Sequence, residues 1–276
     1  MAGRPCVRCS AIATGDRQPR VEYMMPNDLA PTALVIVPTY NEADNIERLV
    51  GLILQQEAPL HVVVVDDHSP DGTGEIVDRL AANDARVSVI HRTSKLGLGT
   101  AYISGFKQAL ERGYGYAITM DADFSHNPRY LPGLLALMSD CDLAIGSRYV
   151  PGGGTEGWPL SRRILSRGAN AFARAMLRLQ AHDCTAGYRC YRREVLQNIG
   201  LDTIFSSGYS FLVEMLTRCE RRGYRVAELP IIFRDREAGA SKISRNEILR
   251  SVYTIIRLKF QRLPWDRWAA SRHHRA

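Results

Sequence analysis

The chain has 276 residues, of which 45% are hydrophobic and 24% charged, and its 36 Lys and Arg against 29 Asp and Glu give a net charge of +7. This composition is typical of a folded globular protein and excludes a disordered chain, a collagen-like chain and a small disulfide scaffold. The positive charge suits an anionic partner, such as nucleic acid, a phosphorylated substrate or an acidic membrane surface, and does not choose among them.

The N-terminal residues 1–30 are rich in Arg, Pro and small polar residues, and we expect them to form a disordered extension. They lack the apolar segment of a secretory signal, and no uninterrupted apolar run in the sequence is long enough to predict a transmembrane helix. Cys6 and Cys9 form a close pair, but no second pair would complete a zinc site. We therefore expect free thiols in a reducing compartment.

From residue 33, short apolar runs alternate with segments of helical periodicity. The predicted strands are 33–37, 61–66, 86–91, 116–120 and 143–146, and the predicted helices are 44–56, 73–83, 99–112 and 128–139. This alternation predicts an α/β fold with a mostly parallel central sheet flanked by helices. Ligands bind beyond the carboxyl ends of the strands in such sheets, where polar clusters fall at 38–42, 66–71 and 121–126.

The rhythm changes after residue 146. We predict a flexible loop at 151–157, a basic amphipathic helix at 161–179, a short strand at 188–191, a helix at 208–222, a strand at 224–233, a polar loop at 234–242 and a basic helix at 243–263. No repeat or linker divides the chain. We expect one catalytic domain over 31–245, followed by a basic amphipathic helix and tail over 246–276.

Asp121 and Asp123 follow an apolar strand and stand two positions apart. If the chain turns there, both carboxylates can face one Mg²⁺ or Mn²⁺ ion, which would also accept diphosphate oxygens. A solvated turn with two acids explains the same pattern. Spacing alone leaves both interpretations open.

The two other polar clusters are weaker signals. Asp66 and Asp67 end a strand before a Ser-Pro-Asp-Gly turn, and the stretch from Pro38 to Glu42 follows the first strand. Either cluster could line a nucleotide pocket, and either could serve only as turn and helix cap. Gly97 and Gly99 do not predict a nicotinamide site, because the third glycine of that fingerprint is replaced by Tyr102.

Basic residues gather in the second half of the chain, and arginine is suited to bind phosphate oxygens. For any single arginine, the alternative to phosphate binding is a place on the solvated surface. The cluster comprises Arg148, Arg162, Arg163, Arg167, Arg189, Arg234, Arg236 and Lys242. The histidines, including His126, show no metal-binding spacing and are interpreted as structural or solvated.

These stretches together resemble the inverting GT-A glycosyltransferases of family 2, and most closely their dolichol-phosphate (polyprenol-phosphate) mannose synthases. The resemblance runs from about residue 34 to about residue 263. It rests on the order and spacing of VPTYNE at 37–42, VDDHSPDGT at 65–73, KLGLGTAY at 95–102, MDADFSH at 120–126, GSRY at 146–149, WPLSRRILSRGAN at 158–170, DCTAGYR at 183–189 and DREAGASK at 235–242.

The resemblance implies a GT-A fold and assigns roles to individual residues. The guanosine of GDP-mannose would be held by Pro38, Tyr40, Glu42, Val65 and Asp67. The diphosphate and a Mg²⁺ or Mn²⁺ ion would be approached by Asp121, Ala122 and Asp123, with Ser125 as a third metal ligand where some members carry Gln. Donor phosphates would be contacted by Arg148, Arg236 and Lys242, and the phosphate of the lipid acceptor by Arg148, Arg162 and Ser166.

The implied reaction transfers mannose from GDP-mannose to a polyprenyl monophosphate with inversion. Asp121, Asp123 and Arg148 would be the catalytic residues, and the acceptor phosphate, already an anion, would need no general base. Because the acceptor is a membrane lipid, the resemblance implies a protein on the cytoplasmic side, in peripheral contact with a membrane or a membrane partner protein. The final helix, with Trp265 and Trp268 after it, could lie at a membrane interface or pack on the core.

Two other functions remain as alternatives. A related enzyme could transfer glucose or another sugar from a UDP-sugar to polyprenyl phosphate. A non-catalytic basic binding module is the other, but we expect no nucleic-acid partner, since the sequence shows no zinc, RNP or helix-turn-helix pattern.

Overall fold

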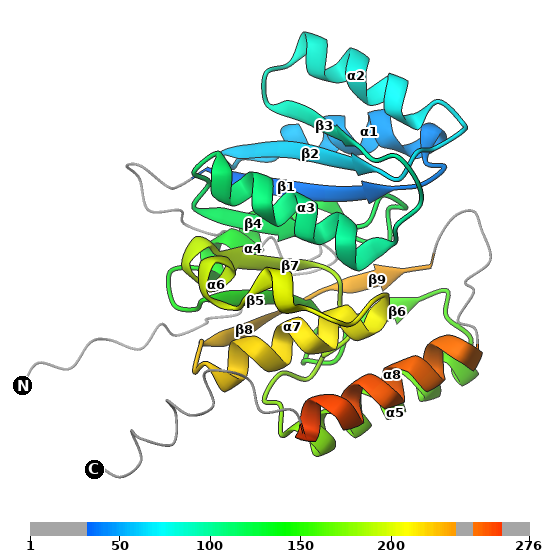
Figure 1. Cartoon of the computed structure of the whole chain (residues 1–276), viewed down its shortest axis with the longest axis vertical. Helices are drawn as coiled ribbons and strands as arrows, with labels where there is room; N and C mark the ends of the chain where they lie inside the picture. Colours follow the sequence, from blue (N-terminus) through cyan, green and yellow to red (C-terminus); the bar gives the residue numbers. More distant parts are fainter. Residues whose placement is uncertain (1–31, 236–244, 261–276) are drawn as a thin grey trace, which may run out of the picture.

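The computed structural model describes residues 32–235 and 245–260, and these form a central sheet with helices on both faces (Figure 1). The sheet has seven strands in the order β3-β2-β1-β4-β7-β5-β8. Their bounds are β1 Ala33–Thr39, β2 Leu60–Asp66, β3 Val87–His91, β4 Tyr116–Thr119, β5 Leu143–Ser147, β7 Arg189–Arg192 and β8 Val226–Pro230. Neighbouring strands are parallel except β7, which is antiparallel to both β4 and β5. The predicted mostly parallel sheet is therefore confirmed.

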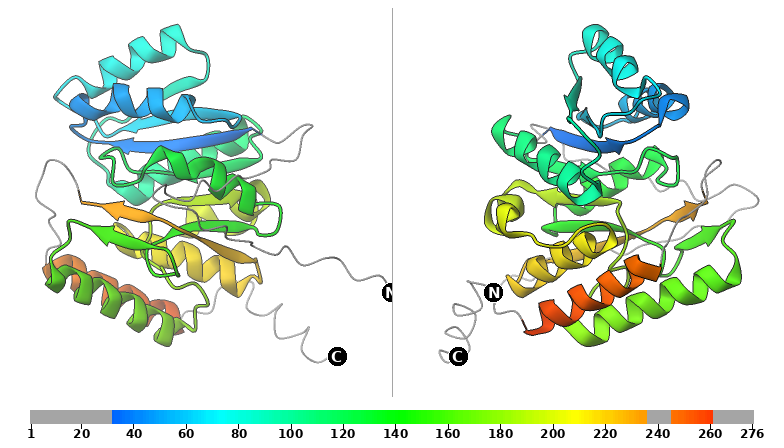
Figure 2. Two further views of the ribbon diagram at one scale, coloured as in Figure 1. Left: turned by 180° about the vertical axis from the view of Figure 1, so that it is seen from behind. Right: turned by 45° about the vertical axis from the view of Figure 1, so that its right-hand side comes forward.

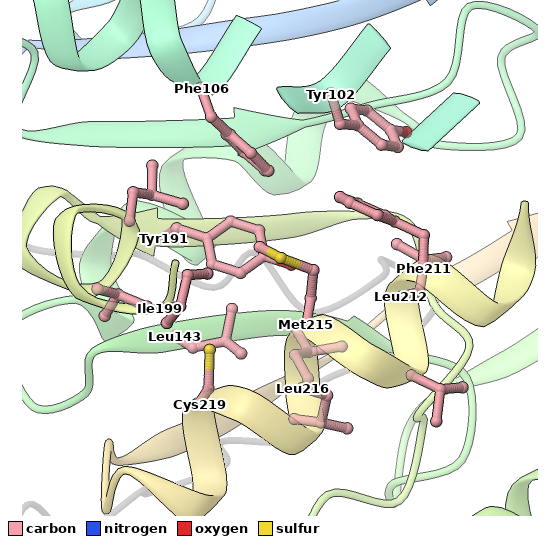
Figure 3. Packing of buried hydrophobic residues seen from close by; sticks show 14 of the residues in the cluster. Tyr102, Phe106, Leu143, Tyr191, Ile199, Phe211, Leu212, Met215, Leu216 and Cys219 are labelled. Atoms are coloured by element: carbon pink, nitrogen blue, oxygen red, sulfur yellow. The ribbon is translucent and has the colours of Figure 1, made fainter. Parts of the chain in front are cut away.

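Helices cover the two faces of the sheet in separate sets. One buried cluster joins β1 and β2 to α1 Ala43–Leu54, α2 Thr73–Asn83 and α4 Leu131–Leu137, which follows the 3₁₀ turn Pro128–Tyr130. The other joins the opposite face to α3 Leu98–Glu111, α6 Arg193–Asn198 and α7 Tyr209–Arg221. Strands β1 and β2 are apolar without alternation because both of their faces are covered. Figure 3 shows the second cluster, where Phe106 of α3 meets Tyr191 of β7 and Tyr102 of α3 lies near Phe211 of α7.

Two long basic helices form an outer layer beside α7. They are α5 Leu160–Leu177 and α8 Arg245–Phe260, which lie side by side in both views (Figure 2). Ile255 and Leu258 of α8 are buried in the core, whereas Tyr253, Ile256 and Phe260 are exposed. The last helix thus packs on the core through one face and leaves a second apolar face exposed. The expected extension over 1–30 and the tail beyond 260 lie outside the described residues.

The single strand predicted over 224–233 is wrong. The structure divides this segment into β8, which pairs with β5, and β9 Ile232–Arg234, which pairs with β6 Gly154–Glu156 in a separate two-stranded sheet. Pro230 has no N–H to extend the first ladder. At Ile231 the N–H donates to Ser147 O and the carbonyl accepts from Gly154 N, so this residue joins the two sheets. The loop predicted at 151–157 accordingly contains a strand.

Candidate active site

A cavity of about 790 Å³ lies at the carboxyl ends of β1, β4 and β5. At one end it is lined by Pro38, Glu42, Asp121, Ala122 and Asp123. It continues past Arg148, Arg162 and Ser166 to apolar residues of α5, α7 and α8, among them Ile164, Leu165, Phe172, Leu212, Val213, Val252 and Ile255. Most of the predicted site residues are therefore brought to one cavity, although they come from separate segments of the chain.

The loops after β1, β2 and β4 each contain a non-glycine residue with a left-handed backbone. These residues are Asn41, His68 and Phe124, with φ of 61°, 60° and 59°. Such conformations cost free energy, are uncommon outside glycine, and cluster at functional sites. Phe124 directly follows Asp123, and both Asp121 and Asp123 line the cavity.

Each of these two carboxylates is held by a fixed hydrogen-bond donor. The Tyr102 hydroxyl donates to Asp121 Oδ1 at 3.0 Å. Ser125 donates to Asp123 Oδ1 through its hydroxyl at 2.5 Å and through its backbone N–H at 3.1 Å. Burial, together with the Asp121 charge, raises the pKa of Tyr102 well above its ordinary value, so the phenol stays a donor at neutral pH.

Ser125 itself is buried and does not line the cavity. The structure shows its hydroxyl orienting Asp123, and the metal-ligand role implied by the resemblance stays a prediction. His126, which the sequence indicated only as structural or solvated, lines the cavity and accepts from the Asp121 backbone N–H through Nδ1 at 3.0 Å. This bond requires an unprotonated Nδ1.

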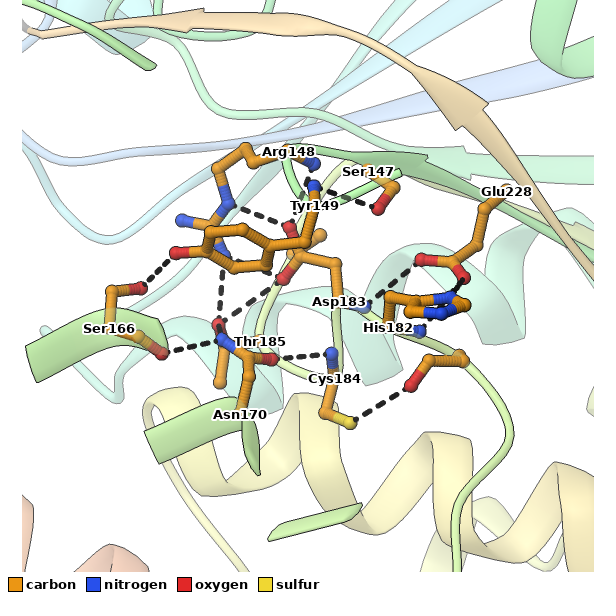
Figure 4. Close-up of polar contacts among 12 residues, drawn as sticks. Ser147, Arg148, Tyr149, Ser166, Asn170, His182, Asp183, Cys184, Thr185 and Glu228 are labelled. Atoms are coloured by element: carbon orange, nitrogen blue, oxygen red, sulfur yellow. Dashed lines mark hydrogen bonds and ion pairs between the residues drawn. The ribbon is translucent and has the colours of Figure 1, made fainter. Parts of the chain in front are cut away.

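Arg148 follows β5 and forms a bidentate ion pair with Asp183 (Figure 4). Its Nε and Nη2 donate to the two carboxylate oxygens at 2.7 Å each, and Nη2 also donates to Thr185 Oγ1 at 2.8 Å. Burial alone would raise the pKa of Asp183, but the Arg148 charge and hydrogen bonds outweigh it and hold the pKa below its ordinary value. Asp183 therefore fixes the guanidinium at the cavity wall as an ion pair.

Arg162 and Ser166 lie on the cavity-facing side of α5. The Arg162 guanidinium donates to Asp235 Oδ1 at 2.8 Å and stacks 4.0 Å from the Trp158 ring centroid. Arg162 Nε and the Trp158 indole N–H are buried and have no hydrogen-bond acceptor within the described part of the chain. Ser166 Oγ accepts from the Tyr149 hydroxyl at 2.7 Å.

The predicted nucleoside residues divide into two groups. Pro38 and Glu42 line the cavity, whereas Tyr40, Val65 and Asp67 do not. The Lys95 ammonium lies 3.6 Å from the Tyr40 ring centroid, and Val65 is buried within β2. Asp67 pairs with Arg92 at 2.7 Å and accepts from Gly97 N at 3.0 Å, which ties the loop before α3 to the end of β2. Arg236 and Lys242 lie outside the described residues.

Arg189 belongs to the predicted basic cluster but does not line the cavity. It is fully buried and donates to the backbone carbonyls of Cys184, Ala186 and Leu212 at 2.7–2.8 Å. It thus holds the loop that carries Asp183 and Thr185. Sequence reasoning missed the roles of Tyr102, Asp183 and Trp158, although all three lie in stretches that carry the family resemblance.

The sequence model of the family described as "Glycosyl transferase family 2" matches residues 34–200. The polyprenol monophosphomannose synthase of Mycolicibacterium smegmatis is 48% identical over 234 residues, covering 83% of this chain and 88% of that protein. The undecaprenyl-phosphate mannosyltransferase of Micrococcus luteus is 48% identical over 224 residues, covering 81% of this chain and 92% of that protein.

Among solved structures, the fold is similar to that of the glucosyl-3-phosphoglycerate synthase of Mycobacterium tuberculosis in complex with Mn²⁺, UDP and glucosyl-3-phosphoglycerate. The TM-score is 0.61 at 17% identity, and the match covers 88% of each chain. This likeness confirms the predicted GT-A fold. The chain therefore belongs to glycosyl transferase family 2 and, within it, to the group of polyprenol-phosphate mannosyltransferases that includes both relatives.

Proposed function

We propose that the protein transfers mannose from GDP-mannose to a polyprenyl (dolichyl-type) monophosphate with inversion, releasing GDP. The observation that carries this proposal is the continuity of the cavity from Asp121 and Asp123 to the apolar walls of α5, α7 and α8. A nucleotide-sugar diphosphate suits the polar end, and an isoprenoid chain suits the apolar end. The names of the two 48% identical relatives supply the sugar and the acceptor class.

The donor would bind with its nucleoside towards the ends of β1 and β2. Pro38 and Glu42 line this part of the cavity, and Tyr40, Val65 and Asp67 belong to the adjoining strand ends. In this arrangement Arg236 and Lys242 would contact the donor phosphates. A UDP-sugar remains the rival donor that the assay below distinguishes.

The carboxylates at the cavity wall fit a divalent cation. Asp121 and Asp123 supply hard oxygen ligands, which Mg²⁺ and Mn²⁺ prefer. The related glucosyl-3-phosphoglycerate synthase structure contains Mn²⁺. A bound cation would offset the negative charge of the departing diphosphate. Ala122 lies between the two carboxylates on the same wall.

The acceptor phosphate would lie between the diphosphate and α5, near Arg148, Arg162 and Ser166. Buried donors at Arg162 Nε and Trp158 Nε1 that lack an acceptor in the described residues are costly, and phosphate oxygens would satisfy them. A phosphate oxygen then attacks the anomeric carbon as the bond to the GDP β-phosphate oxygen breaks. The acceptor is an anion at neutral pH, so these residues act by positioning and charge stabilisation.

The exposed apolar face of α5 and α8 supports peripheral attachment to the cytoplasmic side of a membrane, directly or through a membrane partner protein. Leu160, Ile164, Leu165 and Phe172 of α5 and Tyr253, Ile256 and Phe260 of α8 are all exposed. Arg163, Arg167, Arg257 and Lys259 are exposed beside them, as is typical of helices that lie on anionic lipid. No helix in the described residues meets the length and hydropathy needed to cross a membrane.

The test is an assay of nucleotide release with a short polyprenyl phosphate and either GDP-mannose or UDP-glucose, in Mg²⁺ or Mn²⁺ and in EDTA. We expect acceptor-dependent GDP release that EDTA abolishes, with a β-linked product by NMR. UDP release without GDP release would overturn the donor assignment. Absence of turnover with both donors, in the presence of lipid vesicles, would overturn the proposed reaction.

A further inference from the structure

The buried Tyr102 connects the hydrophobic core to the cavity. Its side chain is fully buried on α3, and its ring stacks with those of Phe106 and Phe211, with centroids 6.3 and 6.1 Å away. Figure 3 shows Tyr102 at the edge of this cluster, near Phe211 of α7. The hydroxyl is the polar end of an otherwise apolar residue, and it donates to Asp121 Oδ1 at 3.0 Å.

Two glycines fix the position of α3, and with it the position of Tyr102. A Cβ added at Gly105 would clash with Ile36 of β1, and one added at Gly99 would lie 3.0 Å from Phe211 Cδ2. The helix therefore packs closely on the strand next to β4 and on α7. Because α3 is fixed, the Tyr102 hydroxyl has a fixed position. Its hydrogen bond therefore holds the Asp121 carboxylate in one place.

The other side of Asp121 is also constrained. Its backbone N–H donates to His126 Nδ1 at 3.0 Å, and the same nitrogen lies 3.8 Å from Asp121 Oδ2. The His126 ring is held by stacking on Tyr188 at 4.9 Å and by edge contact with Phe233 at 5.5 Å. The Asp121 side chain remains 29% exposed, and its residue lines the cavity.

We propose that Tyr102 is a positioning residue that fixes the Asp121 carboxylate in the orientation that binds the divalent cation. The inference rests on the proposed metal-dependent function of this site. Tyr102 does not touch the cation. It holds Oδ1 at the buried side, so that the carboxylate meets the cation in one rotamer. Partners of this kind around a metal ligand typically change metal affinity by about 10–100-fold.

The experiment compares the Mn²⁺ dissociation constants of full-length wild type, Tyr102→Phe and Tyr191→Phe by electron paramagnetic resonance of free Mn²⁺ at saturating GDP. Tyr191 is a matched control, because it is a fully buried tyrosine of the same cluster whose hydroxyl accepts from Arg189 Nη1 at 3.3 Å. We expect an increase of about tenfold or more for Tyr102→Phe and none for Tyr191→Phe. Thermal unfolding of all three proteins checks that the variants are folded.

The possible outcomes distinguish the positioning role of Tyr102 from the metal-dependent function of the site. If wild type binds Mn²⁺ and Tyr102→Phe binds it within twofold of the same constant, the positioning role is wrong and the metal site stands. Equal weakening by both variants also overturns the inference, since it would reflect general loosening of the core. If wild type binds no Mn²⁺ at millimolar concentration in the presence of GDP, the metal-dependent function itself fails.

Discussion

On the β4 side of the cavity, the contacts that hold the acidic residues come mostly from nearby in sequence, whereas on the α5 side, arginines are held by acids far along the chain. Asp123 accepts from Ser125, two positions away, and Asp121 donates through its backbone to His126, five positions away. Arg148 pairs with Asp183 across 35 positions and Arg162 with Asp235 across 73. The acidic side is thus largely a local turn, with one tertiary contact from the Tyr102 hydroxyl to Asp121, 19 positions away, whereas both arginine pairs of the basic side depend on tertiary structure.

This difference changes how the net charge of +7 should be interpreted. The arginines that line the cavity are ion-paired, and Arg189 of the same predicted cluster is buried among backbone carbonyls. The basic side is therefore less positive than its residue count indicates. Its arginines are oriented by their partners, and orientation is what an anion-binding site requires.

The largest expected effect tests the long-range pairing. Asp183→Asn removes the carboxylate charge of the buried Arg148–Asp183 ion pair, which should lower the free energy of unfolding by about 3–5 kcal/mol. Urea denaturation measures this loss, with Asp140→Asn, an exposed acid, as the control. A loss below about 1 kcal/mol would show that the pair does not organise this side of the cavity.

The local side is tested by Asp121→Asn and Asp123→Asn. Each change keeps the side-chain shape and removes a charge from the proposed cation site, so turnover should fall about 10²–10³-fold while the melting temperature changes little. GDP release under metal-replete conditions measures turnover. Asp84→Asn, at an acid paired with Arg86 on the surface, should leave it unchanged. Near-normal turnover by both cavity variants would contradict the assignment.

The Asp183 pair also predicts a pH dependence of stability. The folded-state pKa of Asp183 lies below the ordinary value. The contribution of its ion pair to the free energy of unfolding is therefore present above the unfolded-state pKa of about 3.9 and is lost as the pH falls through the folded-state pKa. The stability difference between wild type and Asp183→Asn should be constant from about pH 8 to pH 5 and should shrink below about pH 4. A stability difference that grows on acidification would contradict this prediction.

A smaller effect is expected at Arg162. Arg162→Met removes a guanidinium that would contact the acceptor phosphate, so the KM for polyprenyl phosphate should rise about tenfold while the KM for GDP-mannose is retained. Arg79→Met is the control, since Arg79 is an exposed arginine of α2 that does not line the cavity. Equal changes in the KM values of both substrates would show that Arg162 does not act specifically on the acceptor phosphate.

The last prediction concerns the exposed face of α8. Ile256→Asp should weaken binding to anionic phospholipid vesicles by on the order of tenfold, because it replaces an apolar contact with a negative charge. Co-sedimentation measures binding, and Ala82→Asp, an exposed position of α2 with the same charge change, is the control. Unchanged sedimentation of Ile256→Asp would remove this face from the proposed attachment.

The sequence was most informative where structure is local. Strand β2 and helix α2 were predicted to within one residue, because both faces of the strand are buried and the helix begins and ends at turn residues. The position of Asp121 and Asp123 at the cavity was also predicted, since both carboxylates follow a strand end. The division of 224–233 into two strands was not predicted, because it depends on which neighbours Ile231 contacts in the folded protein. The pairing of Arg148 with Asp183 was missed for the same reason.

The cavity shares part of its wall with the outside of the protein. Ile164, Leu165 and Phe172 line it and are also exposed on the face proposed to meet the membrane. A polyprenyl phosphate in such a membrane would reach the cavity by lateral diffusion within the lipid layer, while the nucleotide sugar arrives from bulk water. Acceptor supply would then follow the mole fraction of polyprenyl phosphate in the membrane surface, and diluting the protein and vesicles together would leave it unchanged.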